Sequence, residues 1–151
     1  MKKLLVLISI FLLVGCSTKE ENEKYTYLEC KNDLEEQKEY DTEETLDFST
    51  YFNIKREEEV VNYSIVIDNP KEDMHNIKAL LIHDYMNEDA FPSVGIFDEP
   101  KELLKDSKEK IKLEGTIQTS DDISNVKFKL YLEYKDNDNN ENKFYYEVQR
   151  G

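Results

Sequence analysis

The segment VKFKLYLEY, residues 126–134, alternates apolar and mostly polar residues over nine positions. Its even-numbered members are all apolar or aromatic. Because successive side chains of a strand point to opposite faces of a sheet, this period of two predicts a strand with one packed and one solvated face. The segment therefore favours a fold built on antiparallel β-sheet.

Six further short runs share this character and are separated by turn residues such as Asn69-Pro70. About seven strands within about a hundred residues predict an all-β fold, an antiparallel sandwich over residues 45–151. We expect residues 101–109 to form a loop or one helical turn, and Gly115 to mark a bulge or a close approach of two chain segments. The six runs are residues 46–54, 63–67, 77–82, 94–97, 111–117 and 144–148.

The order of features in residues 65–85 is a strand, Asn69-Pro70, the tetrapeptide Asn76-Ile77-Lys78-Ala79, a second strand and Asp84-Tyr85. This order loosely resembles the small immunoglobulin-like modules of bacterial lipoproteins. The resemblance implies an immunoglobulin-like sandwich. The tryptophan and the cysteine pair of antibody-type domains are absent from the sequence after residue 45.

The first residues have the pattern of an export signal. Met1-Lys2-Lys3 is a short basic segment, and residues 4–14 are apolar except for Ser9. This apolar run is shorter than the roughly 20 residues that span a bilayer, and polar residues follow it directly after Cys16.

The tetrapeptide Leu13-Val14-Gly15-Cys16 resembles the lipobox of bacterial lipoproteins. The resemblance implies that residues 1–15 are a signal peptide cleaved between Gly15 and Cys16, with a diacylglyceryl group on the sulfur of Cys16. Acyl chains such as palmitate would then hold the protein on the extracytoplasmic face of the cell membrane, because two chains anchor stably where one is marginal. The alternative is an ordinary secretory signal in which this cysteine occurs by chance.

Residues 17–44 carry eleven acidic residues and four lysines. Such a charged stretch resists collapse, so we expect residues 16–44 to form the lipidated N-terminus and a flexible acidic tether with a reach of roughly 30 Å. Two alternatives are an edge strand at residues 25–30 and a short helix at residues 32–40. If Cys16 is lipidated, Cys30 has no cysteine partner in its own chain. We expect it to lie half-buried on a short strand, and the alternative is a thiol that forms an intermolecular disulfide or reacts with oxidants.

Composition excludes several classes of function. The chain of 151 residues has a net charge of −14, which gives no basic footprint for nucleic acid. Four glycines provide no phosphate-binding loop, and two cysteines form neither a disulfide scaffold nor a four-thiolate zinc site. No serine lies in a nucleophile motif, so the sequence predicts no catalytic residues and no enzyme activity.

Two polar patterns are candidate metal ligands. Asp136, Asp138, Asn140 and Glu147 occupy positions 1, 3, 5 and 12 of an EF-hand-like spacing, which is the arrangement that calcium prefers. Position 6 is a glutamate where the motif needs glycine, so a polar hairpin turn is the alternative. His75 and His83 lack a third ligand at metal spacing, and we expect His83 to line a strand.

The last two strands predict a mixed basic and aromatic outer face. Exposed tyrosines among lysines suit contact with a protein or an envelope polymer, and an ordinary solvated face is the alternative. The sequence thus predicts a lipid-anchored, non-catalytic binding or interaction module. The alternatives are a calcium-responsive structural module that uses residues 136–147, and a protective lipoprotein that intercepts a toxin or phage component. The candidate binding residues are Lys127, Lys129, Tyr131, Lys143 and Tyr145.

Overall fold

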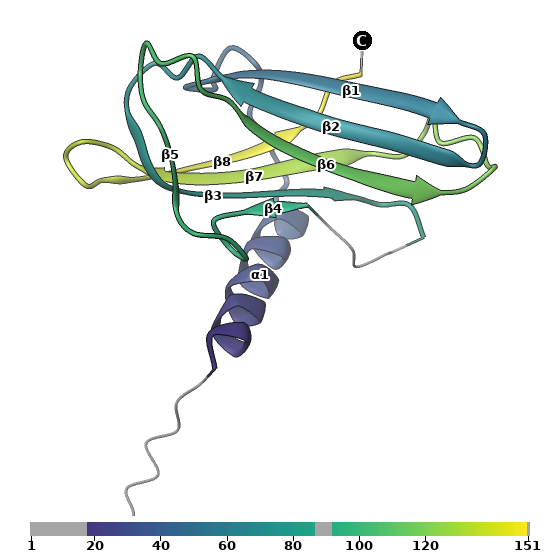
Figure 1. Ribbon diagram of the computed structural model, residues 1–151, viewed down its shortest axis with the longest axis horizontal. Coiled ribbons are helices and arrows are strands. Elements are labelled where there is room, and N and C mark those ends of the chain that lie inside the picture. The colour runs from purple at the N-terminus through teal and green to yellow at the C-terminus, as the bar shows by residue number, and fades with distance from the viewer. Residues whose placement is uncertain (1–17, 87–91, 151) are drawn as a thin grey trace, which may run out of the picture.

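The computed structural model describes residues 18–86 and 92–150, and the tetrapeptide Leu13-Val14-Gly15-Cys16 that resembles a lipobox lies outside these ranges. One helix precedes a series of antiparallel strands (Figure 1). The elements are α1 (Lys19–Glu36), β1 (Ser49–Glu57), β2 (Val60–Asp68), β3 (Met74–His83), β4 (Ser93–Val94), β5 (Lys101–Leu103), β6 (Ile111–Gln118), β7 (Phe128–Lys135) and β8 (Glu141–Glu147).

The strands form two layers, which confirms the predicted all-β sandwich. One sheet has the order β1-β2-β6, and the other has the order β4-β3-β7-β8, with β5 also pairing with β3. Lettered along the chain, these are the pairings A-B-E and C′-C-F-G of immunoglobulin-like sandwiches. β5 departs from that pattern, because it pairs with β3 and not with β6 as strand D would. The described residues form eight strands where the sequence predicts about seven, because part of the expected loop at residues 101–109 pairs with β3 as β5.

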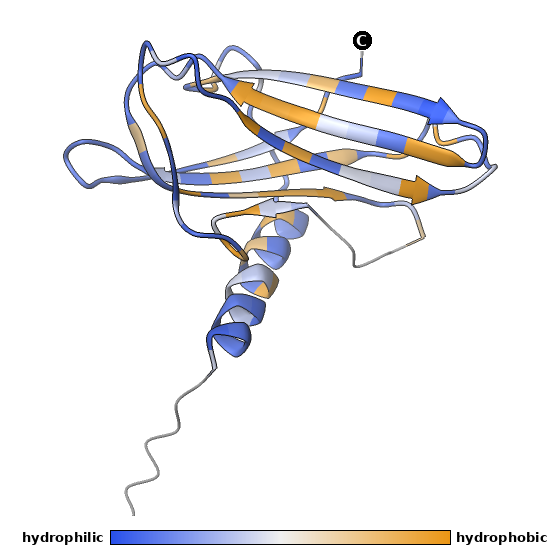
Figure 2. Cartoon of the chain, in the orientation of Figure 1, coloured by the Kyte–Doolittle hydropathy of each residue, from blue (hydrophilic) through white to orange (hydrophobic). Residues whose placement is uncertain are grey.

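The core lies between the two layers. Every second residue of β2 is buried, from Val61 to Ile67, and the intervening residues are half-buried on the outer side. Apolar bands alternate with polar ones along the strands of the β1-β2-β6 sheet (Figure 2). Inward side chains of β3, β6, β7 and β8 complete one continuous cluster, which includes Leu81, Leu113 and Leu132.

Gly115 admits a close approach by the side chain of Tyr63, and the bulge that the sequence offered as the other possibility is not formed. Tyr63 lies directly opposite Gly115 in the β2–β6 pairing, and the register there continues without a shift. A Cβ atom at position 115 would lie 2.5 Å from the Tyr63 hydroxyl oxygen and 2.7 Å from its Cζ. The Tyr63 ring therefore occupies the space that any other side chain at position 115 would need.

The N-terminal acidic segment differs from the flexible coil that its composition predicts. Residues Lys19–Glu36 form α1, which begins with a capping box between Thr18 and Glu21. Cys30 and Leu34 are buried against the outer face of the β4-β3-β7-β8 sheet, in one cluster with Leu80 and Tyr131. Cys30 thus lies on a helix and not on a strand, because a stripe of residues at helical spacing packs against the sheet.

The direction of α1 separates its two ends. Its C-terminal end lies under the β4-β3-β7-β8 sheet, and its N-terminal end points away from both sheets (Figure 1). Within residues 18–86 and 92–150 we find no helix with the length and apolarity that crossing a bilayer requires.

Candidate functional site

The predicted binding face on β7 and β8 is covered in part, while Lys127 and Lys143 remain exposed. Tyr131 and Glu133 are 1% and 7% exposed, and Tyr145 is half-buried. Lys129 stacks over the ring of Tyr40 at 5.0 Å from the ring centroid. The expectation of an exposed face is therefore wrong at Tyr131, because α1 packs over it.

The same packing creates a polar pocket between α1 and the sheet, here named the α1–sheet pocket. Strands β3, β7 and β8 supply its floor and α1 supplies its wall, so residues distant in sequence meet there. Its lining residues are Thr26, Glu29, Cys30, Asn32, Asp33, Lys78, Tyr131, Glu133, Glu141 and Lys143.

Glu133 is the central charge of the α1–sheet pocket. Its Oε1 accepts a hydrogen bond from the Lys78 Nζ at 3.0 Å, and its Oε2 accepts one from the Tyr131 hydroxyl at 2.5 Å. The Lys143 Nζ lies 3.8 Å from the same Oε2. Three donors or cations thus surround one buried carboxylate.

These contacts decide the protonation states in the pocket. Burial opposes ionisation of Glu133, but hydrogen bonds from Tyr131 and Lys78 and the charges of Lys78 and Lys143 outweigh it and hold its pKa below 4.5. Burial, with the hydrogen bond to Glu133, raises the pKa of Tyr131 far above 10.0. The pocket therefore holds an ionised carboxylate and a neutral phenol at neutral pH.

Cys30 faces this pocket as a thiol. Its burial raises the pKa of the thiol above 9.0, and the hydrogen bond with Tyr131 opposes that shift without cancelling it. Because the thiolate is the nucleophilic form, this environment does not activate Cys30.

The predicted calcium ligands do not come together. The Oδ1 of Asp136 accepts hydrogen bonds from the backbone N–H groups of Asp138 and Asn140, at 2.9 and 2.8 Å. Glu147 lies opposite Lys129 at the other end of the β7–β8 hairpin and pairs with Lys127 at 3.4 Å. The loop is a self-bonded polar turn, and the described residues contain no group of three or more histidine, cysteine or acidic side chains arranged to hold a metal ion.

The two histidines differ in burial and in the residues that they contact. His83 is 5% exposed and packs edge-on against Tyr63 in the core, as expected for a residue that lines a strand. His75 joins the β7–β8 loop to β5, since its Nε2 lies 2.8 Å from the Asn137 Oδ1 and its Nδ1 lies 3.1 Å from the Glu102 Oε1.

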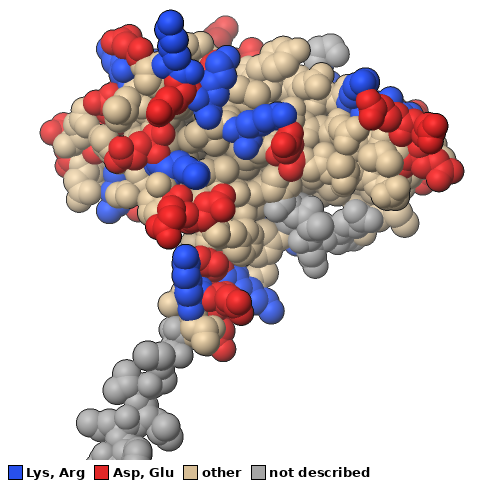
Figure 3. All heavy atoms as spheres, in the orientation of Figure 1, with Lys and Arg blue, Asp and Glu red and all other residues tan. Residues whose placement is uncertain are grey.

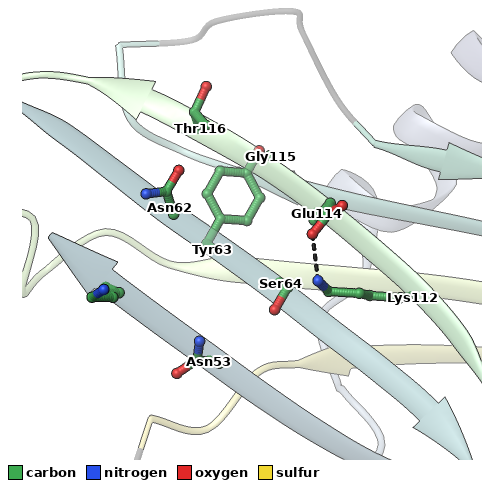
Figure 4. A pocket seen from close by; sticks show the side chains of 9 residues that line it. Asn53, Asn62, Tyr63, Ser64, Lys112, Glu114, Gly115 and Thr116 are labelled. Carbon is green, nitrogen blue, oxygen red and sulfur yellow. Dashed lines mark ion pairs between the residues drawn. The ribbon is translucent and has the colours of Figure 1, made fainter. Parts of the chain in front are cut away.

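A second hollow lies on the outer face of the β1-β2-β6 sheet (Figure 4). Its rim is polar and includes Asn53, Asn62 and Ser64, with an ion pair of 2.5 Å between Lys112 and Glu114. No charged pair in this hollow is buried as Glu133 is, since the side chains of Lys112 and Glu114 are 52% and 66% exposed.

The sequence interpretation did not find the α1–sheet pocket because it did not predict α1. Two signals were present. Thr18 is followed three residues later by Glu21, which is the spacing of a capping box, and Tyr27, Cys30 and Leu34 recur at helical spacing.

Comparisons of this chain with protein-family models, with curated protein sequences and with solved structures found no match. The site is therefore interpreted from its own geometry.

Proposed function

We propose that this protein is a lipid-anchored, extracytoplasmic module that binds a partner without catalysis. The observation that carries the proposal is the position of the lipobox relative to α1. Cys16 precedes the helix cap Thr18 by two residues, so a lipid on Cys16 would attach almost directly to a helix that packs on the sandwich.

In this proposal α1 is a spacer of defined direction. A helix rises about 1.5 Å per residue, so the 18 residues of α1 span about 27 Å. That length is close to the reach of the flexible tether predicted above, but a helix packed at Cys30 and Leu34 also fixes the orientation of the sandwich.

This orientation supports a role for the β1-β2-β6 sheet in binding. Its outer face lies on the side of the sandwich remote from α1 (Figure 1) and contains the polar hollow. In the view of Figure 3 charged side chains gather toward the two ends of the sandwich and along α1, and a basic and an acidic side chain also lie near its centre. A partner, whether a protein or an envelope polymer, would meet this remote face first.

The chemistry of the α1–sheet pocket favours binding over catalysis. Its carboxylate already accepts hydrogen bonds from Tyr131 and Lys78, and its thiol has a raised pKa. General acid–base and nucleophilic catalysis instead require groups whose pKa values lie near the working pH.

The anchor is tested by expressing the full chain in a bacterial host as wild type, Cys16→Ser and Cys30→Ser. We expect the wild type and the matched Cys30→Ser control in the membrane fraction, with intact mass showing loss of residues 1–15 and gain of a diacylglyceryl group. Cys16→Ser should keep residues 1–15 and lack the lipid. An unmodified Cys16 in the wild type would contradict the proposal.

The orientation and the binding face are tested on intact cells. A Tyr51→Cys variant should react with a membrane-impermeant maleimide, because Tyr51 is 69% exposed on the remote face. Asn62→Arg, which places a bulky cation in the hollow, should reduce cross-linking of a partner, whereas Asn125→Arg in the β6–β7 loop should not. Equal capture by both variants would exclude the hollow.

A further inference from the structure

Among the described residues, 18–86 and 92–150, strand β1 pairs with β2 alone and forms a sheet edge. It pairs with β2 over nine residues without a register shift and is the terminal strand of its sheet. The edges of the other sheet offer less unpaired backbone. At one edge lie β4 and β5, which have only two and three residues. At its other edge the N–H of Asp41 donates to the Tyr145 carbonyl of β8 at 2.7 Å. A long regular edge presents unpaired backbone groups to another strand.

We propose that β1 is the interface of a homodimer, in which two copies pair antiparallel with Asn53 of one copy opposite Asn53 of the other. This is the register that pairs all nine residues of Ser49–Glu57. The three-stranded sheets of the two copies then join into one continuous sheet.

The sequence of β1 is complementary to itself in this register. Phe52 lies opposite Ile54 of the second copy, which is an apolar pair, and Tyr51 lies opposite Lys55. Cross-strand pairs of these kinds stabilise antiparallel sheets. The outer pairs are Thr50 with Arg56 and Ser49 with Glu57, so no like charges face one another.

Neighbouring registers are less favourable. A shift by two residues in one direction places Phe52 opposite Arg56, and a further shift places Lys55 opposite Lys55. A shift by two residues in the other direction pairs seven residues instead of nine, because Arg56 and Glu57 then extend beyond Ser49 of the other copy. Strand length and the apolar pair of Phe52 with Ile54 thus select the register centred on Asn53. The shift that pairs Lys55 with Lys55 is also opposed by charge, because like charges directly opposite one another destabilise a strand pair.

The charge of β1 also contrasts with that of the whole chain. The full sequence has a net charge of −14, whereas β1 contains Lys55, Arg56 and a single acidic residue, Glu57. Within Ser49–Glu57 the proposed pairing therefore sets no acidic residue of one copy opposite an acidic residue of the other.

Burial along β1 indicates a surface that a partner strand would complete. Phe52 and Ile54 are half-buried, while their β2 partners Ile65 and Tyr63 are 0% and 2% exposed. A second copy of β1 would cover the remaining apolar surface of Phe52 and Ile54.

The other edge of this sheet does not fit a second copy in the same way. β6 has eight residues, Ile111–Gln118, so full-length antiparallel pairing with itself has no central residue. It would place inward residues opposite outward ones, which the pleat of an antiparallel pair does not allow.

The dimer is compatible with attachment to one membrane, a point that rests on the proposed function. The twofold axis of an antiparallel edge pair is perpendicular to the sheet, so both copies keep the same sheet face on the same side. α1 extends from the side of the other sheet (Figure 1), and both copies of α1 would therefore point toward one bilayer.

Disulfide trapping in isolated membranes tests the interface with the full chain in a Cys30→Ser background. Directly opposite residues of an antiparallel pair have Cα atoms about 4.5–5.5 Å apart, within the range of a disulfide. Asn53→Cys should form a covalent dimer of twice the chain mass under a mild oxidant. The Glu57→Cys variant should remain monomeric, because in this register position 57 of one copy lies far from position 57 of the other.

Mixing provides the complementary measurement. Coexpressed Ser49→Cys and Glu57→Cys chains should cross-link to one another, because these positions face each other across the proposed pair. Asn53→Glu should abolish the dimer in native mass spectrometry of the detergent-solubilised protein without lowering the thermal midpoint of the sandwich.

Three outcomes would overturn the interface. They are no cross-link at position 53, an equal cross-link at position 57, and a product whose mass identifies a different protein. Membrane fractionation is read separately, so loss of the anchor and loss of the dimer are distinguishable.

Discussion

The two outer faces of the sandwich differ in what covers them. On β2 each buried residue alternates with a half-buried one along the whole strand. On β7 the five residues Leu130–Tyr134 are all buried, although the sequence there alternates just as regularly. The alternation of apolar and polar residues in the sequence indicates which residues face the core. It does not indicate whether the residues on the other face contact water or a helix.

The chemistry of the two faces follows from this difference. Under α1 the outward residues include Tyr131 and Glu133, which satisfy each other by a hydrogen bond of 2.5 Å. On the uncovered face the ion pair of Lys112 and Glu114 is half or more exposed, and such pairs contribute little to stability. Four changes test this contrast, in order of expected effect.

Leu34→Ala should have the largest effect, because Leu34 is fully buried between α1 and the sheet. Truncating a buried leucine costs about 2–5 kcal/mol, and each 1.4 kcal/mol is about tenfold in an equilibrium constant. We expect the buried Cys30 thiol to react at least about tenfold faster with a thiol reagent. Leu28→Ala is the matched control, since Leu28 is 42% exposed, and equal rates in both variants would show that α1 does not protect Cys30.

Gly115→Ala should destabilise the uncovered sheet by about 1–3 kcal/mol, because the new methyl group overlaps the Tyr63 ring. Chemical denaturation measures the loss. Tyr63→Phe in the same chain should recover part of it by removing the hydroxyl oxygen. Thr116→Ala, an exposed neighbour, should change the free energy of unfolding by less than about 0.5 kcal/mol. A Gly115→Ala variant as stable as wild type would contradict the close approach.

Glu133→Gln should lower the free energy of unfolding at neutral pH by about 1–3 kcal/mol, the scale of hydrogen bonds to a charged group. The pKa of Glu133 in the folded chain lies below 4.5, so its ionised form stabilises the fold above that pH. This contribution is lost as the pH falls through the lower folded pKa. Denaturation of both proteins from neutral to acidic pH should therefore give curves that converge, and a constant difference would contradict the assignment.

The smallest effect concerns His75. Hydrogen bonds with Asn137 and then Glu102 raise the pKa of His75 above 6.5. Its stabilisation is therefore complete below pH 6.5 and is lost as the pH rises through the folded pKa, with a magnitude below about 1 kcal/mol at this partly exposed site. NMR titration should show a His75 pKa that falls toward 6.5 in Asn137→Ala, and an unchanged value would exclude the contact.

The parts of the fold that the sequence predicted depend on local pattern. The strand at residues 126–134 and the constraint at Gly115 follow from the period of two and from one missing side chain. β5 was missed because Lys101–Leu103 is three residues long and pairs only through the edge of β3. Such short strands carry no periodicity of their own.

The site was less predictable, for a physical reason. Tyr131 has the sequence position of an exposed residue, and only the packing of α1 makes it buried. The acidic composition of residues 17–44 favours a coil. The helical spacing of Cys30 and Leu34 was too weak a signal to predict a helix against that composition. Tertiary contacts with Leu80 and Ile82 supply the stabilisation that the helix lacks alone.

The pairing of β3 with β7 also has a consequence for the order in which the protein is made. His75 is paired with Lys135 and His83 with Phe128, so β3 waits through at least 45 residues of synthesis before its central partner leaves the ribosome. Until then the larger sheet has no centre and α1 has no complete surface on which to dock. The export proposed above would use this interval, because a chain that has not yet formed its central sheet can still be threaded through a translocation channel.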